Sequence, residues 1–391
     1  MSLVVYTNDE LHSRDVMANF FQNIFKKMDE SVIGIDIGAS SIKVVQLRKK
    51  KGRAVLETYG ELALGPYGNF VVGQVTNLPP EKIAEAIKDV LKESNVTSTS
   101  SGMSIPFRSS LVSLIDMPKV SDKQLQEMIP LEARKYIPVP ISEVTLDWWV
   151  VPNESDSALD FVENEDEKKQ ADILAKQKLQ VLVVSIHNEI LSNYTSIVKL
   201  AELKTTFFEI EMFSATRALL SGETTPVMVF DLGASSTKLY VLERGVVKYS
   251  HVINKGSQDI TISISKGLNI PFERAEQIKR ELGTGKVANE KDVYEIISLT
   301  LDFIFSEANS VFLNYQKKFN KTISKVILTG GGVAMKGVVE LARANFQTEV
   351  EIGNPFAKVE TPAFLEDVLL ATGLEFAVAI GVALRKLQEL G

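Results

Sequence analysis

Two stretches of the chain share nearly the same order of apolar runs and small polar residues. Residues 32–47 are VIGIDIGASSIKVVQL, residues 227–242 are VMVFDLGASSTKLYVL, and half of the sixteen aligned positions are identical. In each copy an apolar run rich in β-branched residues ends in Asp-x-Gly-Ala-Ser-Ser-x-Lys, and a second apolar run follows. This pattern predicts a strand, a tight turn and an antiparallel strand in each half of the chain. Turns at 49–53 and 243–245 predict a third strand after each pair.

Segments with helical periodicity follow each copy. The pattern predicts one helix over 80–94 after the first copy, and helices over 257–268, 272–282 and 291–318 after the second. A short apolar strand, 325–329, precedes three glycines, and a last helix containing Ala and Gly is predicted over 371–390. Strands alternating with helices in two related halves indicate an α/β protein with two lobes of one fold.

A separate unit is predicted between the two copies, over about 108–203. Its pattern gives a strand (111–117), a helix (121–136), a strand (144–151), a strand (179–186) and a helix (188–202). The segment 153–169 between its second and third strands is rich in acidic residues and poor in large apolar ones, which predicts a solvated loop.

The residues before the first copy contain one amphipathic segment. In 13–28, a helix would place Met17, Phe20, Phe21, Phe25 and Met28 on one side. Such a helix docks on the protein body or serves as an interfacial or partner-binding helix, and the sequence leaves both readings open.

Composition excludes several classes of site. Apolar residues make up 45% of the chain, charged residues 24%, and the formal net charge is −7, which argues against broad binding to nucleic acid. Because the chain has no cysteine, it has no disulfide, zinc–thiolate site or cysteine nucleophile. Its three histidines are far apart in sequence. Neither an uninterrupted apolar run of membrane-spanning length nor a signal-peptide pattern is found, so we expect a cytoplasmic protein that meets the membrane only through partners.

The repeated motif has the chemistry of a phosphate site. Glycine permits positive φ and close approach of the main chain to a ligand, and a turn of backbone N–H groups and hydroxyls can surround an anion. A lysine on the following strand can neutralise phosphate charge, and a carboxylate beside phosphates is suited to Mg²⁺ held through water. The predicted phosphate-binding residues are Gly38, Ala39, Ser40, Ser41 and Lys43 in the first copy and Gly233, Ala234, Ser235, Ser236, Thr237 and Lys238 in the second, with Asp36 and Asp231 toward the metal.

Other phosphate motifs do not fit. The segment 283–286 (GTGK) lacks the upstream glycine of a P-loop, and Val287 stands where a Ser or Thr would hold Mg²⁺. A dinucleotide fingerprint after a strand is also missing. Gly330, Gly331 and Gly332 follow a predicted strand, and their turn could let a ribose or an adenine lie against the backbone.

Together these motifs resemble the actin, Hsp70 and sugar-kinase superfamily, whose two related lobes bind ATP between them. The resemblance implies an actin-like two-lobed fold (duplicated RNase H-like domains), with two phosphate loops at the repeated motif and an adenosine loop at 329–332. It implies that Glu276 and Lys279 on the predicted helix 272–282 reach the ribose and adenine. It also implies hinge helices over 211–220 and 372–384, the second with Gly381 at a close helix crossing.

The inserted unit makes the chain most similar to the PilM family. Its run MPKVSDKQLQEMIPLEARKYIPVPISEVTLDWWVV and the segment FFEIEMFSATRALL carry this resemblance, which extends over about residues 20–391. It implies an ATP- or ADP- and Mg²⁺-binding component of the type IV pilus inner-membrane platform. It further implies that this component docks the cytoplasmic N-terminal tail of a PilN-like membrane protein and joins other platform proteins. Whether copies of the component associate with one another stays open. The expected divisions are 1–30 (leader and amphipathic helix), 31–107 (first lobe), 108–203 (inserted αβ subdomain), 204–225 (first lobe continued), 226–370 (second lobe) and 371–391 (C-terminal hinge helix).

Hydrolysis and two alternative functions stay open on the sequence. Glu211, at the first hinge, is the candidate to polarise an attacking water, but a carboxylate at a helix start is equally explained by the helix dipole. Weak or partner-dependent ATPase activity is therefore compatible with the motifs. An FtsA-like cell-division filament protein would end in a linker and a membrane-binding helix, which is not expected here. A small-molecule kinase of the same fold would need a substrate pocket with a catalytic aspartate.

Overall fold

The computed structural model describes residues 5–6, 31–151, 178–283 and 291–390. The chain divides into two compact units: the smaller one comprises Met1–Val5 and Phe107–Tyr194, and the larger one comprises Tyr6–Pro106 and Thr195–Gly391. The first of these overlaps the predicted inserted subdomain, 108–203, although its C-terminal boundary lies inside helix α5 (Asn188–Leu200). The predicted amphipathic segment 13–28 and the acidic segment 153–169 lie outside the described residues.

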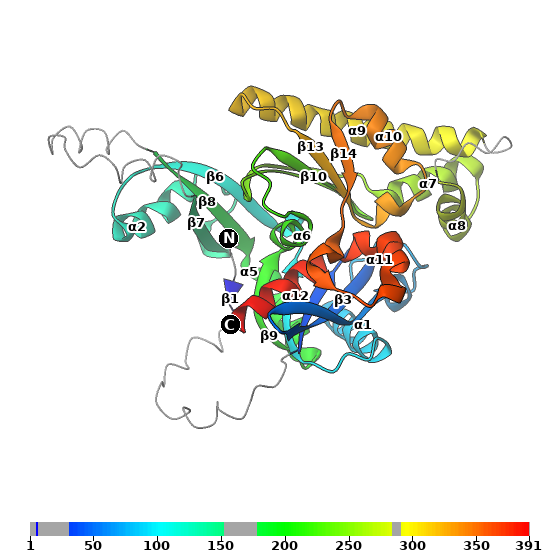
Figure 1. Cartoon of the computed structure of the whole chain (residues 1–391), viewed down its shortest axis with the longest axis horizontal. Coiled ribbons are helices and arrows are strands. Elements are labelled where there is room, and N and C mark those ends of the chain that lie inside the picture. The colour runs from blue at the N-terminus through cyan, green and yellow to red at the C-terminus, as the bar shows by residue number, and fades with distance from the viewer. Residues whose placement is uncertain (1–4, 7–30, 152–177, 284–290, 391) are drawn as a thin grey trace. The chain divides into compact units, whose positions relative to one another are not determined.

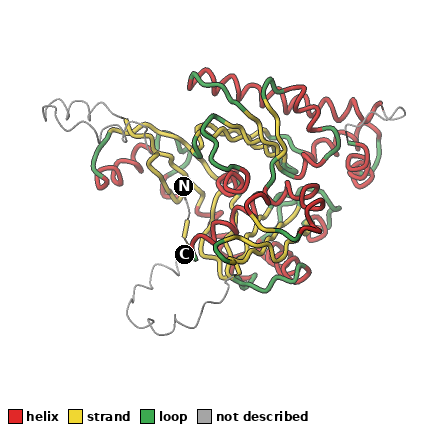
Figure 2. Tube along the Cα trace, viewed as in Figure 1, coloured by secondary structure: helices red, strands yellow, loops and turns green. Residues whose placement is uncertain are grey.

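The larger unit contains two sheets with the same internal arrangement (Figures 1 and 2). The first has the order β1-β9-β5-β2-β3-β4-β15 and the second the order β12-β11-β10-β13-β14. In both, three antiparallel strands come from the repeated motif, and two parallel strands follow beside the first of them. The duplication seen in the sequence is therefore a duplication of topology, and we call the two sheets with their helices the first and second lobes.

The first lobe is built from both ends of the chain and from residues around the middle. Its strands are β1 (Val5–Tyr6), β2 (Ser31–Ile37), β3 (Ser41–Lys50), β4 (Arg53–Ala63), β5 (Ser100–Ile105), β9 (Lys204–Ile210) and β15 (Val359–Glu360). Its helices are α1 (Pro80–Glu93), α6 (Glu211–Leu219), α11 (Glu366–Thr372) and α12 (Ala377–Glu389). Strands β5 and β9 were not predicted. The sequence of β5, SSGMSI, consists mostly of small and polar residues, which give no strand pattern. In the structure, a Cβ added at Gly102 of β5 would lie 2.4 Å from the ring of Phe207 on β9, so the two strands pack closely there.

Helix α12 packs closely on both of its neighbours in the first lobe. A Cβ added at Gly34 on β2 would lie 1.9 Å from the carbonyl oxygen of Ala379, and one added at Gly381 would lie 1.8 Å from that of Ser214 on α6. The predicted close crossing at Gly381 is thus confirmed. The predicted single helix 371–390 is wrong, since a 3-10 turn at Gly373–Phe376 separates α11 from α12. The carbonyl of Leu374 in this turn accepts hydrogen bonds from Thr329 and Gly330, which hold it out of a continuous helix.

The second lobe has one dominant core. Its strands are β10 (Val227–Leu232), β11 (Thr237–Glu243), β12 (Val246–Ile253), β13 (Lys325–Thr329) and β14 (Glu349–Ile352), and its helices are α7 (Ser257–Leu268), α8 (Phe272–Leu282), α9 (Lys291–Phe319) and α10 (Val338–Asn345). Phe305 of α9 stacks on Phe230 of β10 at 5.7 Å between ring centroids, and Phe346 meets both rings edge-on. Apolar residues of α9 at helical spacing thus fill the core, as the periodicity predicted.

The smaller unit is a three-stranded antiparallel sheet with one helix on it. The sheet has the order β6-β8-β7, with β6 (Ser110–Pro118), β7 (Val144–Val151) and β8 (Lys178–His187). Helix α2 (Asp122–Ala133) begins with a capping box, in which Ser121 and Gln124 bind each other's backbone N–H groups. Ile129 and Leu125 of α2 are buried against Ile115 and Val183 of the sheet.

Two helical stretches are long and apolar enough, by length and composition, to cross a membrane. They are Asp292–Phe319 and Ala363–Glu389, and charged residues interrupt the apolar sequence of both. Length and composition alone are weak evidence, because core helices pass the same test. Ile304 and Phe305 of the first and Ala379 and Ile380 of the second are fully buried in lobe cores.

Candidate functional site

The loops that join β2 to β3 and β10 to β11 close in the same way. The N–H of Gly38 donates to the carbonyl of Ser41 at 2.9 Å, and the N–H of Gly233 donates to that of Ser236 at 3.1 Å. Neither glycine adopts positive φ, which corrects the sequence-based expectation. Their role is spatial instead, because an added Cβ would lie 2.9 Å from the Ser41 oxygen and 3.0 Å from the Ser236 oxygen, respectively.

Both loops line one cavity of about 420 Å³ in the larger unit. All of the residues predicted from the sequence line it except Thr237: Asp36, Gly38, Ala39, Ser40, Ser41, Lys43, Glu211, Asp231, Gly233, Ala234, Ser235, Ser236, Lys238, Glu276, Lys279, Gly330, Gly331 and Gly332. The side chain of Thr237 is buried, and its hydroxyl donates to the carbonyl of Lys255 at 2.8 Å. Thr237 therefore supports the second loop from behind.

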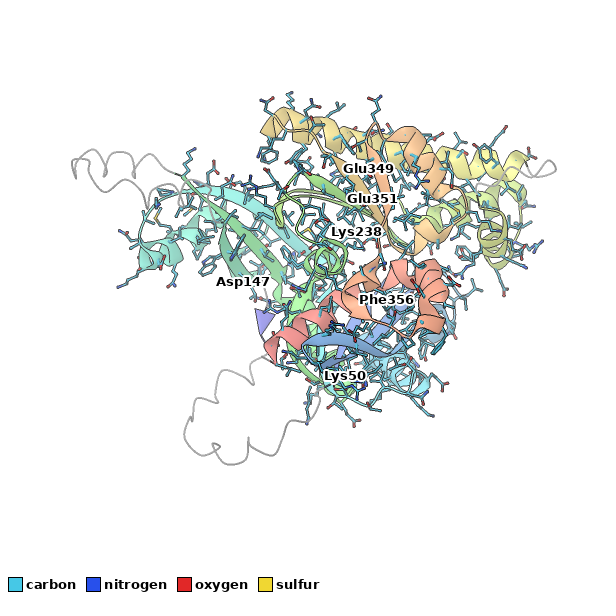
Figure 3. The ribbon with its side chains drawn as sticks, in the orientation of Figure 1. Lys50, Asp147, Lys238, Glu349, Glu351 and Phe356 are labelled. Carbon is cyan, nitrogen blue, oxygen red and sulfur yellow. The ribbon has the colours of Figure 1, made fainter. Side chains whose placement is uncertain are left out.

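Lys238, which is labelled in Figure 3, is held by two carboxylates. It lies opposite Asp231 across the β10–β11 pair, and its Nζ lies 3.3 Å from Asp231 Oδ2 and 2.8 Å from Glu211 Oε2. Burial alone would lower the pKa of Lys238, but attraction to Asp231 and Glu211 outweighs burial and holds that pKa well above its usual range. Burial raises the pKa of Glu211 despite the ammonium beside it.

The first motif has the same cross-strand pair with different partners. Asp36 lies opposite Lys43, and the hydroxyl of Ser104 on β5 donates to Asp36 Oδ1 at 2.7 Å. Burial raises the pKa of Asp36, although the Ser104 hydrogen bond and the nearby lysines favour its charged form. Lys43 Nζ donates to Ser41 Oγ at 2.6 Å and lies 3.2 Å from Glu61 Oε1 and 3.6 Å from Glu375 Oε2. Ser104 and the two glutamates are site residues that the sequence did not reveal.

A second charged cluster lines the cavity on α8. Glu276 pairs with Lys279 at 2.7 Å and with Arg280 at 2.8 Å, and it accepts a hydrogen bond from the Thr261 hydroxyl at 2.6 Å. Burial would raise the pKa of Glu276, but Lys279 and these hydrogen bonds lower it, so the carboxylate is charged. Gly73 of the first lobe, with φ near +87°, lies on this carboxylate, since an added Cβ would meet Glu276 at 3.1 Å.

The glycine loop after β13 lies directly on the second motif. Gly330 has φ near +90°, where glycine is favoured, and a Cβ there would lie 2.4 Å from Asp231 Oδ1. Its N–H donates to the carbonyl of Leu374 at 3.2 Å. The carboxylate of Asp231 is thus enclosed between Lys238 and a bare stretch of backbone.

The donor set suits an anion that brings its own metal. In the described part of the chain, no three or more Asp, Glu and His side chains gather in a way that could hold a metal ion by themselves. The hydroxyl of Ser236, in the second loop, is buried without a hydrogen-bond partner among the described residues. Two lysines, two loops of small residues and two carboxylates fit a polyphosphate whose oxygens complete the coordination of a hard cation.

The smaller unit has a narrow groove of its own, with an interior volume of about 10 Å³, which is no more than one water molecule needs. It is lined by Leu111, Ser113 and Ile115 of β6, Val183 and Ser185 of β8, and Ala133, Tyr136 and Ile137 at the end of α2 and just after it. Most of this lining is apolar, and Tyr136 is largely exposed beside it.

A family model described as "Type IV pilus assembly protein PilM" matches residues 34–387. The chain belongs to the PilM family. A solved structure titled "PilM-PilN type IV pilus biogenesis complex" superposes with a TM-score of 0.75 at 24% identity, covering 91% of this chain and 98% of that one. The ethanolamine utilization protein EutJ from Carboxydothermus hydrogenoformans superposes with a TM-score of 0.52 at 13% identity, covering 91% of this chain and 90% of that one. These likenesses establish the actin-like two-lobed fold.

Cell division proteins FtsA are also similar to this PilM family member. The protein from Bacillus subtilis is 26% identical over 262 residues, covering 61% of this chain and 58% of its own length. The protein from Neisseria meningitidis is 30% identical over 168 residues, covering 35% of this chain and 40% of its own length. The chain thus spans only about half the length of these curated relatives. They fit the same superfamily, whereas the match of the PilM model extends over nearly the whole chain.

Proposed function

We propose that this PilM family protein binds ATP or ADP with Mg²⁺ between its two lobes. The observation that carries the proposal is the convergence of two copies of one loop, from two sheets, on a single cavity. In the second copy, the N-terminal turn of α7 supports the loop, since the N–H groups of Ser257 and Gln258 donate to the carbonyls of Gly233 and Ala234. Fixing these carbonyls leaves the loop's own N–H groups and hydroxyls for phosphate oxygens.

Magnesium fits between the two cross-strand pairs. Asp36 and Asp231 would bind its water shell, while phosphate oxygens supply the direct ligands, because Mg²⁺ commonly keeps several waters in phosphate sites. When bound, the ion supplies positive charge to a cavity whose lysines are already paired with carboxylates. Lys43 and Lys238 would then orient the phosphates from opposite sides.

The base and ribose are assigned to Glu276 and Lys279 on α8 and to the bare backbone of Gly331 and Gly332. All four residues line the same cavity as the two loops. The charged carboxylate of Glu276 can accept hydrogen bonds from ribose hydroxyls, and a glycine backbone lets an aromatic ring approach closely.

Hydrolysis is proposed to be weak or dependent on a partner. Glu211 lies in the cavity, but its carboxylate is paired with Lys238 at 2.8 Å. An ion-paired carboxylate is a poorer base for an attacking water than a free one. Bound nucleotide would therefore act mainly as a ligand that holds the lobes together, with Glu211 orienting Lys238.

For the assembly role, we propose that the protein lies in the cytoplasm as a peripheral part of the inner-membrane pilus platform. It would dock the N-terminal tail of a PilN-like membrane protein in the groove of the smaller unit. Membership in the PilM family supports this role. The apolar lining between β6, β8 and the end of α2, with the exposed ring of Tyr136, supports contact with one small apolar side chain of the tail at this place. A division role is the second candidate, favoured by the likeness to FtsA.

MgATP is expected to raise the melting temperature of the protein. At a hundredfold excess of ligand over its Kd, ligand linkage adds about 2.7 kcal/mol to the free energy of unfolding. Differential scanning fluorimetry with ATP, ADP and Mg²⁺, each alone and combined, measures the effect. Absence of any shift at millimolar MgATP would count decisively against the nucleotide site.

Replacing Tyr136 by Asp is expected to weaken the binding of a PilN-like tail peptide by at least about tenfold, because a charge at the groove opposes apolar contact. Leu131→Asp is the matched control, since Leu131 is exposed on the last turn of α2, shortly before Tyr136, and does not line the groove. Fluorescence anisotropy with a labelled peptide from the same organism provides the measurement. Equal loss in both variants, or in neither, would contradict docking in this groove.

A further inference from the structure

Glu375 occupies a position that the proposed nucleotide would need. It lies in the 3-10 turn Gly373–Phe376, between α11 and α12, and its Oε2 lies 3.6 Å from Lys43 Nζ. The same oxygen would lie 3.2 Å from a Cβ added at Gly331 in the glycine loop. This carboxylate thus spans from the lysine of the first phosphate loop to the backbone assigned to the adenosine. A ligand that extends from one to the other has to pass it.

The ammonium of Lys43 is surrounded by three oxygens of the protein, from Ser41 at 2.6 Å, Glu61 at 3.2 Å and Glu375 at 3.6 Å. The Glu375 oxygen lies beyond hydrogen-bond distance, so its pairing with Lys43 is one of charge alone. A phosphate that approaches Lys43 competes with Glu375 for that charge. Ser41 and Glu61 lie on β3 and β4, the two strands that pair beside the lysine, whereas Glu375 lies on a separate turn and at the longest distance.

We propose that Glu375 is a built-in competitor for the phosphate site, a carboxylate that binds Lys43 until nucleotide displaces it. This inference rests on the proposed nucleotide function and assigns a means of regulation to it. Displacement moves a side chain in the turn whose Leu374 carbonyl accepts hydrogen bonds from Thr329 and Gly330 of the second lobe. Replacement of the Glu375 carboxylate by phosphate at Lys43 is therefore coupled to the hydrogen bonds between the glycine loop and the turn that precedes α12.

The two carboxylates beside Lys43 are unequal, which makes the exchange sensitive to pH. Glu61 and Glu375 both lie beside the Lys43 ammonium and interact with each other. For Glu61, burial would raise the pKa, but Lys43 and the hydrogen bonds lower it. Burial raises the pKa of Glu375, with repulsion from Glu61 adding to it and Lys43 opposing it. As pH falls, Glu375 is protonated first and releases the ammonium.

The test compares MgATP affinity in the wild type and in Glu375→Gln by isothermal titration calorimetry. We expect about tenfold tighter binding by Glu375→Gln at pH 8, because the amide does not compete for Lys43 as an anion and does not repel phosphate. The difference should shrink as the pH is lowered, because protonation of the wild-type carboxyl removes the charge that competes for Lys43. Glu366→Gln is the control, since it removes an exposed carboxylate of α11 that does not line the cavity and should leave affinity unchanged.

Each outcome is decisive. Unchanged or weaker binding by Glu375→Gln, with normal binding by the wild type, overturns the competitor role and leaves the nucleotide site intact. Weaker binding would mean that Glu375 contacts the nucleotide or its metal favourably. An equal gain in MgATP affinity in Glu366→Gln would mean that the gain comes from general surface charge, and it would also overturn the competitor role of Glu375. If neither wild type nor variant binds MgATP while both melt cooperatively, the nucleotide function itself fails.

Discussion

Replacing Arg217 by Ala is expected to lower the free energy of unfolding by about 3–5 kcal/mol, because it leaves a fully buried carboxylate without its charged partner, with only the Ser214 hydroxyl still donating to it. Glu209 on β9 has no exposed side-chain surface, and Arg217 on α6 binds it with both terminal nitrogens, at 2.5 and 2.6 Å. The guanidinium also donates to the carbonyl of Gly381 at 3.0 Å, so it joins β9, α6 and α12.

The measurement is urea-induced unfolding followed by circular dichroism. Arg343→Ala is the control, since Arg343 lies exposed on α10 and makes no ion pair among the described residues. We expect a change within about 0.5 kcal/mol for the control. A loss below about 1 kcal/mol for Arg217→Ala would show that Glu209 finds another partner or is neutral in the folded protein.

Replacing Lys238 by Met is expected to weaken MgATP binding by at least about a hundredfold, which corresponds to about 2.7 kcal/mol. Methionine keeps the length of the side chain but removes the charge that separates Asp231 from Glu211. These two carboxylates and the nearby Asp36 would then repel the incoming phosphates. Lys266→Met is the matched control, because Lys266 lies exposed on α7 outside the cavity.

Titration calorimetry at constant ionic strength measures this loss, and the melting temperature without nucleotide shows whether the variant is folded. Affinity that survives intact in a folded Lys238→Met protein would remove this lysine from the phosphate site. Loss of binding in Lys266→Met as well would point to a nonspecific effect of charge.

Much of the fold and of the candidate site could be predicted from the sequence, because the information is local. Each hairpin has its own turn residues, and the apolar runs around Asp36 and Asp231 are long enough to specify strands. The pairing of Asp36 with Lys43 and of Asp231 with Lys238 then follows from strand geometry. Helix α9 was equally clear because its buried residues recur at helical spacing.

Other site residues depend on contacts between distant segments and could not be found in this way. Glu61 belongs to a strand that pairs with β3, and nothing in its neighbours distinguishes it from a surface glutamate. Glu375 fell within a pattern that predicted continuous helix, and only the hydrogen bonds to Leu374 from the second lobe create the turn that presents it. Ser104 lies on a strand whose small residues carry no alternation of apolar and polar side chains.

The register of the two hairpins limits how either loop could change in length. Successive residues of a strand point to opposite sides of the sheet, and each lysine faces its aspartate directly across the pair. Inserting or deleting one residue between Gly38 and Ser41 would turn Lys43 toward the core and bring Val44 toward the ligand. Loop-grafting experiments on this protein should therefore exchange whole motifs of equal length, since only such exchanges keep both charges on the side where phosphate is expected.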